Sequence, residues 1–135
     1  MARAFPEPGE EVRLPGAVLF RTTAGAAVID LLAAGVGPAR AAAATGAALT
    51  AAALAGTPYD LVVSAGIGGG FAPGAPLGSL VVADAITVAD LGAETADGFL
   101  PVTELGFGTV THRPPESLVR AVAEATGART GTVLT

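Results

Sequence analysis

The sequence predicts an α/β fold in which helices flank a mixed, mainly parallel sheet. Two observations support this class: strand-like runs alternate with helix-like runs, and the strand-like runs are apolar and rich in β-branched residues. The 135 residues are enough for one modest domain. We therefore expect a single, partial domain over residues 1–135.

The first elements expected along the chain are a loop and a hairpin. Residues 6–16, "PEPGEEVRLPG", are dense in proline and glycine, which predicts a loop. The runs "AVLFRTT" and "AVIDLL" flank a short Ala-Gly-Ala turn, so residues 17–32 are expected to form a hairpin of two strands.

A helix and a buried strand are expected next. Pro38 suits the first turn of a helix, where its missing N–H is not needed, and Gly56 suits the position after a helix end. A helix is therefore predicted over residues 38–55. The apolar run "YDLVVSA", residues 59–65, predicts a buried strand in a parallel sheet.

The second half repeats the alternation. A strand is predicted over residues 79–90, and a loop over 91–113 with a short strand near 109–111. Residues 114–127 show an apolar stripe at helical spacing between two prolines and a glycine, which predicts a helix. The run "RTGTVLT", residues 129–135, begins a further strand. Because that strand is cut short and no opening parallel strand precedes the hairpin, we expect a chain truncated at both ends.

Composition and charge exclude several classes of function. Seven basic against 12 acidic residues give a net charge of −5, which disfavours binding to nucleic acid. The absence of cysteine excludes disulfides and thiolate metal sites. No signal peptide precedes the hairpin, and the alanine-rich stretch 39–55 is too weakly apolar to span a membrane. We expect a cytoplasmic protein.

The motif most suggestive of a ligand site is the run "SAGIGGGF", residues 64–71. A dinucleotide fingerprint is disfavoured, because Phe71 stands where glycine or alanine is wanted and the prolines that follow cannot open a helix. No Gly-Lys-Ser/Thr follows, which excludes a nucleoside-triphosphate loop. Two interpretations stay open: a ligand site at the end of a strand, where glycines admit close backbone approach, or a tight connection that binds nothing.

Two stretches carry a resemblance to a known family. "GVGPARAAAATG" and "YDLVVSAGIGGGFAPGAPLGSLVVADAITVADLGAET" resemble the nucleoside phosphorylase/nucleosidase superfamily, over about residues 17–95. The stretch "ADLGAETADGFLPVTELGFG", residues 89–108, is most similar to the futalosine hydrolase branch. The resemblance implies part of the three-layer phosphorylase/hydrolase fold.

The resemblance also implies a reaction. Members of this branch cleave the N-glycosidic bond of futalosine with water, giving hypoxanthine and dehypoxanthine futalosine in menaquinone biosynthesis. The transition state is oxocarbenium-like, as in glycoside hydrolysis generally. An aspartate protonates the leaving purine, and a glutamate near the N-terminus activates the water. No metal or organic cofactor is implied, and homo-oligomers are expected.

The resemblance assigns six residues of this chain to substrate binding. Val36 matches a position near the ribose and the attacking water. The glycines match a loop whose backbone lies along the nucleoside. Phe71 would contact the face of the purine or, equally, pack in the core. The six residues are Val36, Gly66, Ile67, Gly68, Gly69 and Phe71.

Departures from the family pattern refine the expectation. Ser64 and Ile67 stand where phosphorolytic relatives place an arginine and a serine, so water is favoured as the acceptor over phosphate. The family's aspartate and ribose-binding glutamate lie beyond Thr135, and Glu10 and Glu11 are interpreted as a solvated turn. No catalytic residue is assigned, and the chain alone is expected to be inactive. The alternatives are a methylthioadenosine/adenosylhomocysteine-type nucleosidase or a non-catalytic nucleoside-binding remnant.

Five other residues invite a role. Asp84 and Asp90 are expected on one face of one strand, where they could bind a metal, act in acid–base catalysis or satisfy backbone groups. His112 is interpreted as an exposed loop residue. Arg40 and Arg113 are candidates to meet the benzoate of futalosine.

Overall fold

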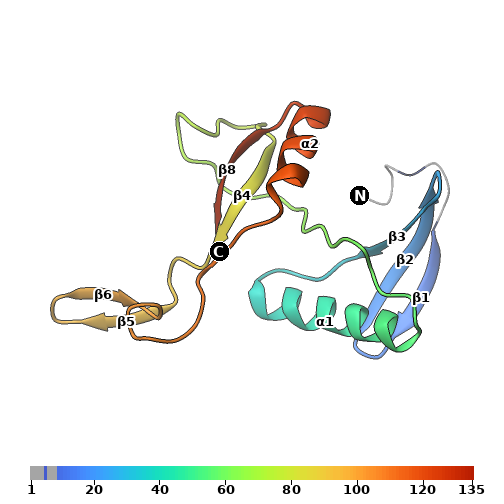
Figure 1. Ribbon diagram of the computed structural model, residues 1–135, viewed down its shortest axis with the longest axis horizontal. Helices are drawn as coiled ribbons and strands as arrows, with labels where there is room; N and C mark the ends of the chain where they lie inside the picture. Colours follow the sequence, from blue (N-terminus) through green and yellow to red (C-terminus); the bar gives the residue numbers. More distant parts are fainter. Residues whose placement is uncertain (1–4, 6–8) are drawn as a thin grey trace. The chain divides into compact units, whose positions relative to one another are not determined.

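The computed structural model describes residue 5 and residues 9–135, and the chain divides between Ala65 and Gly66 into two compact units (Figure 1). Each unit combines strands with one helix, which confirms the α/β class. The two units are described in turn.

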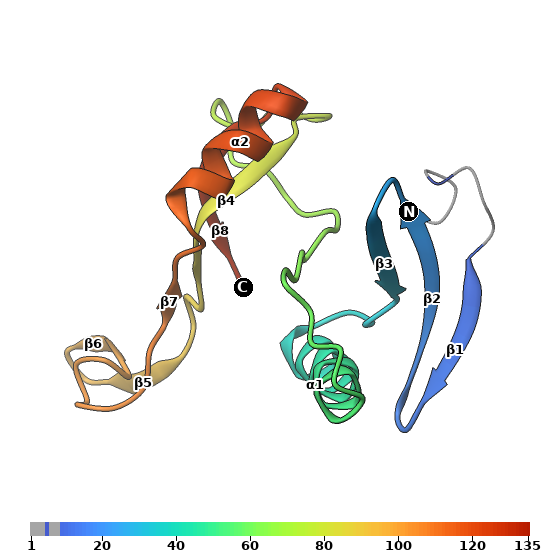
Figure 2. The same cartoon turned by 45° about the vertical axis from the view of Figure 1, so that its right-hand side comes forward.

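The first unit contains a three-stranded antiparallel sheet in the order β1-β2-β3 (Figure 2). Its strands are β1 (Glu10–Leu14), β2 (Ala17–Ala24) and β3 (Ala27–Leu32). The predicted hairpin over residues 17–32 is confirmed: Ala24 pairs with Ala27 across a turn in which Gly25 has a φ of 60°.

The loop predicted over residues 6–16 is wrong for residues 10–14, and residues 6–8 lie outside the described part. Leu14 pairs with Ala17 across a two-residue turn, in which Gly16 has a φ of 83°. Such a turn needs a glycine and joins two strands directly. The glycine that suggested a loop therefore makes the hairpin possible.

Helix α1 (Pro38–Leu54) follows the sheet and contacts β1 and β2. Pro38 lies in its first turn, and Gly56, with a φ of 73°, follows the C-cap residue Ala55, which confirms the predicted helix and its two ends. The small core of this unit contains the buried side chains of Leu19, Thr22 and Ala48.

The buried parallel strand predicted over residues 59–65 is not present. This segment has no regular secondary structure, and Leu61, Val62 and Val63 are exposed. An apolar run forms a buried strand only where neighbouring strands accept its hydrogen bonds, and none of the three described sheets includes it. Its apolar character was therefore insufficient to predict a strand.

The second unit has β4 (Val81–Thr87) at the centre of a three-stranded sheet. β8 (Arg129–Leu134) pairs with it in parallel, and β7 (Thr111–His112) pairs antiparallel on the other side. Helix α2 (Glu116–Thr126) contacts β4 and β8 and ends at Gly127, whose φ is 67°. Buried side chains of this unit are Ala85, Val102 and Val119.

Two expectations for this unit need correction. Among the described strands, parallel pairing is confined to β4 and β8, so their sheet is mixed rather than mainly parallel. Residues 91–113, expected to be mostly loop, contain the hairpin of β5 (Gly92–Thr95) and β6 (Gly98–Pro101), whereas β7 (Thr111–His112) overlaps the short strand expected near residues 109–111. Gly98, which begins β6 after the two-residue turn, has a φ of 124°, and the Thr95 hydroxyl donates to the Gly98 carbonyl at 2.7 Å.

Candidate functional site

The glycine-rich segment, residues 64–71, is an exposed stretch without helix or strand. Ile67 is fully exposed, and the Phe71 side chain is 79% exposed, so Phe71 does not pack in a core here. The segment does not follow a strand, which corrects that part of the expectation. The chain after it forms turns rather than a helix, as the two prolines predicted.

The glycines of this segment differ in why the chain needs them. At Gly70 a Cβ atom would overlap the backbone carbonyl of Ala75, so only glycine fits. At Gly66, Gly68 and Gly69 the φ angles are not positive, and a Cβ would meet no described atom within 4 Å. Neither backbone conformation nor packing within the described residues therefore requires glycine at these three positions.

A compact turn closes the segment downstream. The amide of Ala75 donates to the Phe71 carbonyl at 2.9 Å, and the Arg129 guanidinium donates through Nη1 to the Gly74 carbonyl at 2.8 Å. Arg129 is distant in sequence, and no sequence pattern indicated that it would lie beside this turn. It begins β8, and its own amide donates to Leu80 at 3.0 Å, so the contact links the turn to the sheet of the second unit.

Val36 belongs to the first unit, in the turn before α1. It lies between Gly35 and Gly37, which have φ angles of 88° and 90°, and its side chain is 93% exposed. The Arg40 side chain covers Gly35, because a Cβ at Gly35 would lie 3.1 Å from Arg40 Nε. The two glycines therefore shape a turn that presents Val36 outward and brings Arg40 against the backbone.

The most tightly bonded polar cluster is one that the sequence analysis missed. Arg21 on β2 lies directly opposite Asp30 on β3, and its Nε and Nη2 donate to Oδ1 and Oδ2 of Asp30, both at 2.8 Å. The Tyr59 hydroxyl donates to Asp30 Oδ2 at 2.5 Å. The Asp30 side chain is only 5% exposed, whereas that of Arg21 is 47% exposed. Opposite charges at paired strand positions were the available signal.

These contacts shift the ionisation of all three groups. The hydrogen bonds from Arg21, partly opposed by burial, lower the pKa of Asp30 below its ordinary value. The hydrogen bond to Asp30 raises the pKa of Arg21, which stays cationic. Burial, followed by the hydrogen bond to Asp30, raises the pKa of Tyr59. The cluster is therefore an ion pair with a neutral tyrosine donor.

The remaining predicted residues do not converge. Asp84 lies at a register shift in β4, and Asp90 lies beyond the strand, which ends at Thr87; the prediction that both share one strand face is therefore wrong. His112 is exposed, although it lies in β7 rather than in a loop. Arg113 is likewise exposed.

Glu10 and Glu11 are exposed, but they lie on β1 rather than in a turn. Glu11 forms an ion pair with Arg13 at 2.6 Å. Both glutamates are therefore solvated, as expected, but they lie on a strand and not in the expected turn.

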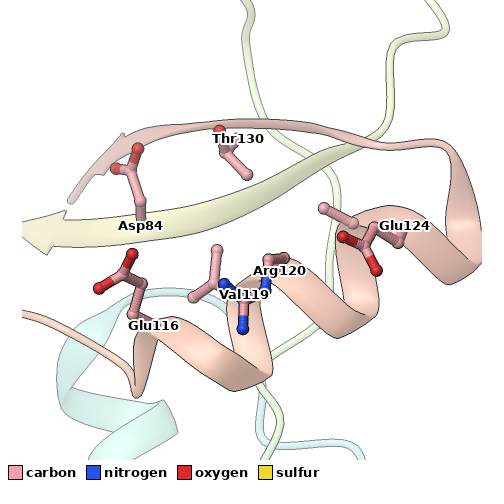
Figure 3. A pocket seen from close by; sticks show the side chains of 7 residues that line it. Asp84, Glu116, Val119, Arg120, Glu124 and Thr130 are labelled. Atoms are coloured by element: carbon pink, nitrogen blue, oxygen red, sulfur yellow. The ribbon is translucent and has the colours of Figure 1, made fainter.

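A shallow pocket of about 300 Å³ lies between α2 and the β4–β8 pair (Figure 3). None of the six proposed substrate-binding residues contributes to it. Carboxylates predominate among its polar side chains, with one guanidinium. The lining residues are Asp84, Glu116, Val119, Arg120, Ala123, Glu124 and Thr130. Over residue 5 and residues 9–135, no three histidine, aspartate or glutamate side chains are placed to hold a metal ion, and no helix is long and apolar enough to cross a membrane.

Comparisons with known proteins identify relatives. The chain is 79% identical over all 135 residues to a futalosine hydrolase of Streptomyces coelicolor, and it covers 56% of that protein. It is 46% identical over 71 residues to a futalosine hydrolase of Acidothermus cellulolyticus, covering 51% of this chain and 27% of the relative. No protein-family model matches. The chain thus spans about half the length of the first of these relatives.

A solved structure shares the fold. It is a mutant of Helicobacter pylori MTAN, an MTA nucleosidase, with 5'-methylthioadenosine in the active site; the TM-score is 0.68 at 18% identity. The match covers 98% of this chain and 55% of the other. The resemblance to futalosine hydrolases predicted from the sequence is therefore confirmed over the full length of the chain, which has the fold of the corresponding part of an MTA nucleosidase.

Proposed function

We propose that the whole protein is an N-glycosyl hydrolase that cleaves futalosine with water, releasing hypoxanthine and dehypoxanthine futalosine in menaquinone biosynthesis. The observation that carries this proposal is the 79% identity, over every residue of the chain, to a futalosine hydrolase. At such identity, most of the residues that line a shared site are the same in both proteins. A shared substrate is therefore a better explanation than two different substrates.

Within this proposed reaction, we assign binding of the nucleoside to this chain. Gly66, Gly68 and Gly69 are not required by conformation or packing among the described residues, so their lack of side chains is best explained by something that approaches the backbone. Consecutive amides of such a segment can donate to a ligand. We propose that base and ribose lie along this backbone, with Ile67 and Phe71 supplying apolar contacts.

Water is the acceptor that this segment favours. A phosphate needs cationic or hydroxyl donors, and Ile67 offers neither. Arg129 is a cation near the segment that could in principle bind a phosphate. Its Nη1, however, already donates to the Gly74 carbonyl. Removing the guanidinium from that carbonyl to hold phosphate would leave the turn without this hydrogen bond.

The general acid and general base are proposed to lie outside this chain, in the part of the relatives that it does not span. Each such group typically contributes about 10²–10⁴-fold to the rate. We therefore expect the 135-residue chain alone to bind nucleoside and to release no measurable base. The resemblance further suggests a cytoplasmic homo-oligomer, which analytical ultracentrifugation of the whole protein would test.

The decisive assay follows hypoxanthine release from futalosine by the whole protein, with and without phosphate. We expect equal rates in both buffers, whereas strict dependence on phosphate would refute a hydrolase. Gly68→Ala should raise the KM for futalosine at least about tenfold without altering stability, because its Cβ meets only space that the ligand would fill. Gly46→Ala, an open helical position on α1, is the matched control and should leave KM unchanged.

A second candidate substrate is methylthioadenosine, which the fold of the solved nucleosidase makes reasonable. The two substrates differ in the base, 6-oxo in futalosine and 6-amino in methylthioadenosine. Adenine release from methylthioadenosine at a higher kcat/KM than hypoxanthine release from futalosine would replace the first proposal with the second.

A further inference from the structure

A single residue, Arg129, contacts both ends of residues 74–80, the stretch that leads from the turn after the glycine-rich segment to β4. Its Nη1 donates to the Gly74 carbonyl at 2.8 Å, and its backbone amide donates to the Leu80 carbonyl at 3.0 Å. All of these residues belong to the second unit, residues 66–135. The two contacts therefore fix both ends of this stretch through one residue of the same unit.

The sheet of the second unit fixes the backbone of Arg129. Arg129 is the first residue of β8 and pairs with Val81, the first residue of β4, in the parallel ladder. Helix α2 contacts both strands, and its Val119 is one of the buried residues of this unit. Because the ladder holds the backbone of Arg129, its guanidinium ties the Gly74 carbonyl to the sheet through a single side chain.

The turn that Arg129 holds is compact and carries an exposed aromatic ring. The amide of Ala75 donates to the Phe71 carbonyl at 2.9 Å, and a Cβ atom at Gly70 would overlap the Ala75 carbonyl. The Phe71 side chain is 79% exposed. The backbone around Phe71 is thus constrained by close contacts with Ala75, while the ring itself is presented outward.

We propose that Arg129 is a positioning residue that holds the turn of residues 71–75 so that the Phe71 ring can receive the face of the purine base. This inference rests on the proposed function for its ligand, whereas the contacts that carry it all lie within the second unit. An aromatic ring suits this task because every base has a π-face on which it can stack. Arg129 acts through the turn and needs no contact of its own with the base.

The expected signature is weaker binding of the base with little change in catalysis. When only a fraction of the protein is competent to bind, the apparent dissociation constant rises by the inverse of that fraction. Arg129→Met should therefore raise both the KM for futalosine and the inhibition constant of free hypoxanthine about three- to tenfold, and leave kcat within about twofold. Phe71→Ala, which removes the ring, should raise the same two constants by about tenfold or more.

The test compares these variants in the whole protein. Arg129→Lys keeps one cationic donor and should recover part of the hypoxanthine affinity that Arg129→Met loses. Arg120→Met is the matched control, because Arg120 is an exposed arginine on α2 of the same unit, and it should leave both constants unchanged. An inhibition constant that does not rise in Arg129→Met, or that rises equally in Arg120→Met, would overturn the inference.

A second measurement needs no substrate. Because the Ala75 amide donates to the Phe71 carbonyl, its exchange with solvent hydrogen reports how often the turn opens. This exchange should be about three- to tenfold faster in Arg129→Met, with the amides of α2 unchanged, and an unaltered Ala75 rate would also overturn the inference. If the unmodified protein releases no hypoxanthine from futalosine, the proposed function fails, and the Ala75 exchange rate alone then decides whether Arg129 holds the turn.

Discussion

Asp30→Asn should lower the free energy of unfolding by about 2 kcal/mol at pH 7. Asparagine keeps the size of the side chain and one acceptor oxygen. It removes the negative charge that receives two hydrogen bonds from Arg21 and one from Tyr59. The three hydrogen bonds to residue 30 therefore no longer have a charged acceptor.

The magnitude follows from how far each partner is exposed. Breaking a fully buried ion pair costs about 3–5 kcal/mol, because a charge is left without a partner, whereas exposed pairs contribute about 0–1 kcal/mol. Here Asp30 is 5% exposed and Arg21 is 47% exposed. Water can solvate the freed guanidinium, so the loss falls between these limits, at about 2 kcal/mol.

The difference should depend on pH in one direction. The folded protein holds the pKa of Asp30 below its ordinary value of 3.8. A carboxyl whose pKa is lowered by folding contributes stability that is fully present above the unfolded pKa and is lost as pH falls through the folded pKa. The stability difference between Asp and Asn should therefore be largest near neutrality and shrink progressively below about pH 4.

Urea denaturation followed by circular dichroism, over a pH series from neutrality into acid, checks both expectations. With an m value of about 1–3 kcal/mol/M, the neutral-pH midpoint should fall by roughly 1 M. Glu11→Gln removes the carboxylate of an exposed ion pair and should change stability by less than about 0.5 kcal/mol. A midpoint difference for Asp30→Asn that is absent at neutrality, or that persists unchanged in acid, would refute the reasoning.

Further predictions concern packing and helix ends, each measured by the same denaturation. Leu19→Ala should lower the free energy of unfolding by about 3 kcal/mol, because Leu19 is 1% exposed, while Leu54→Ala, at an exposed leucine, should change it by less than about 0.5 kcal/mol. Equal effects would contradict the assigned core. Gly127→Ala should destabilise by about 1 kcal/mol, since the φ of 67° disfavours a Cβ that meets no other atom; an unaltered midpoint would exclude a left-handed C-cap. Gly46→Ala should stabilise by up to about 1 kcal/mol, and a loss of stability would mean that this open helical position is packed.

The candidate site was only partly predictable from sequence. Glycines in a row indicate where a backbone can be approached, so the sequence marked residues 64–71 as a loop that could bind a ligand, whereas the exposure of Ile67 came only from the structure. The arginine that donates to the Gly74 carbonyl, just after this segment, is 55 residues away along the chain, and Tyr59 donates to an aspartate 29 residues before it. No local sequence pattern encodes such long-range contacts, because they depend on which strands pair and in which register.

The sequence by itself determined the elements whose stabilising interactions are local. Helices α1 and α2 end where Gly56 and Gly127 allow positive φ angles, and α1 begins at a proline that fits its first turn. Tertiary structure decided the elements that need a partner: residues 10–14 became a strand because β2 lies beside them, and residues 59–65 did not because no described strand does. Hydrogen bonds within a helix join residues four apart, whereas a strand depends on a neighbour that can lie anywhere in the chain.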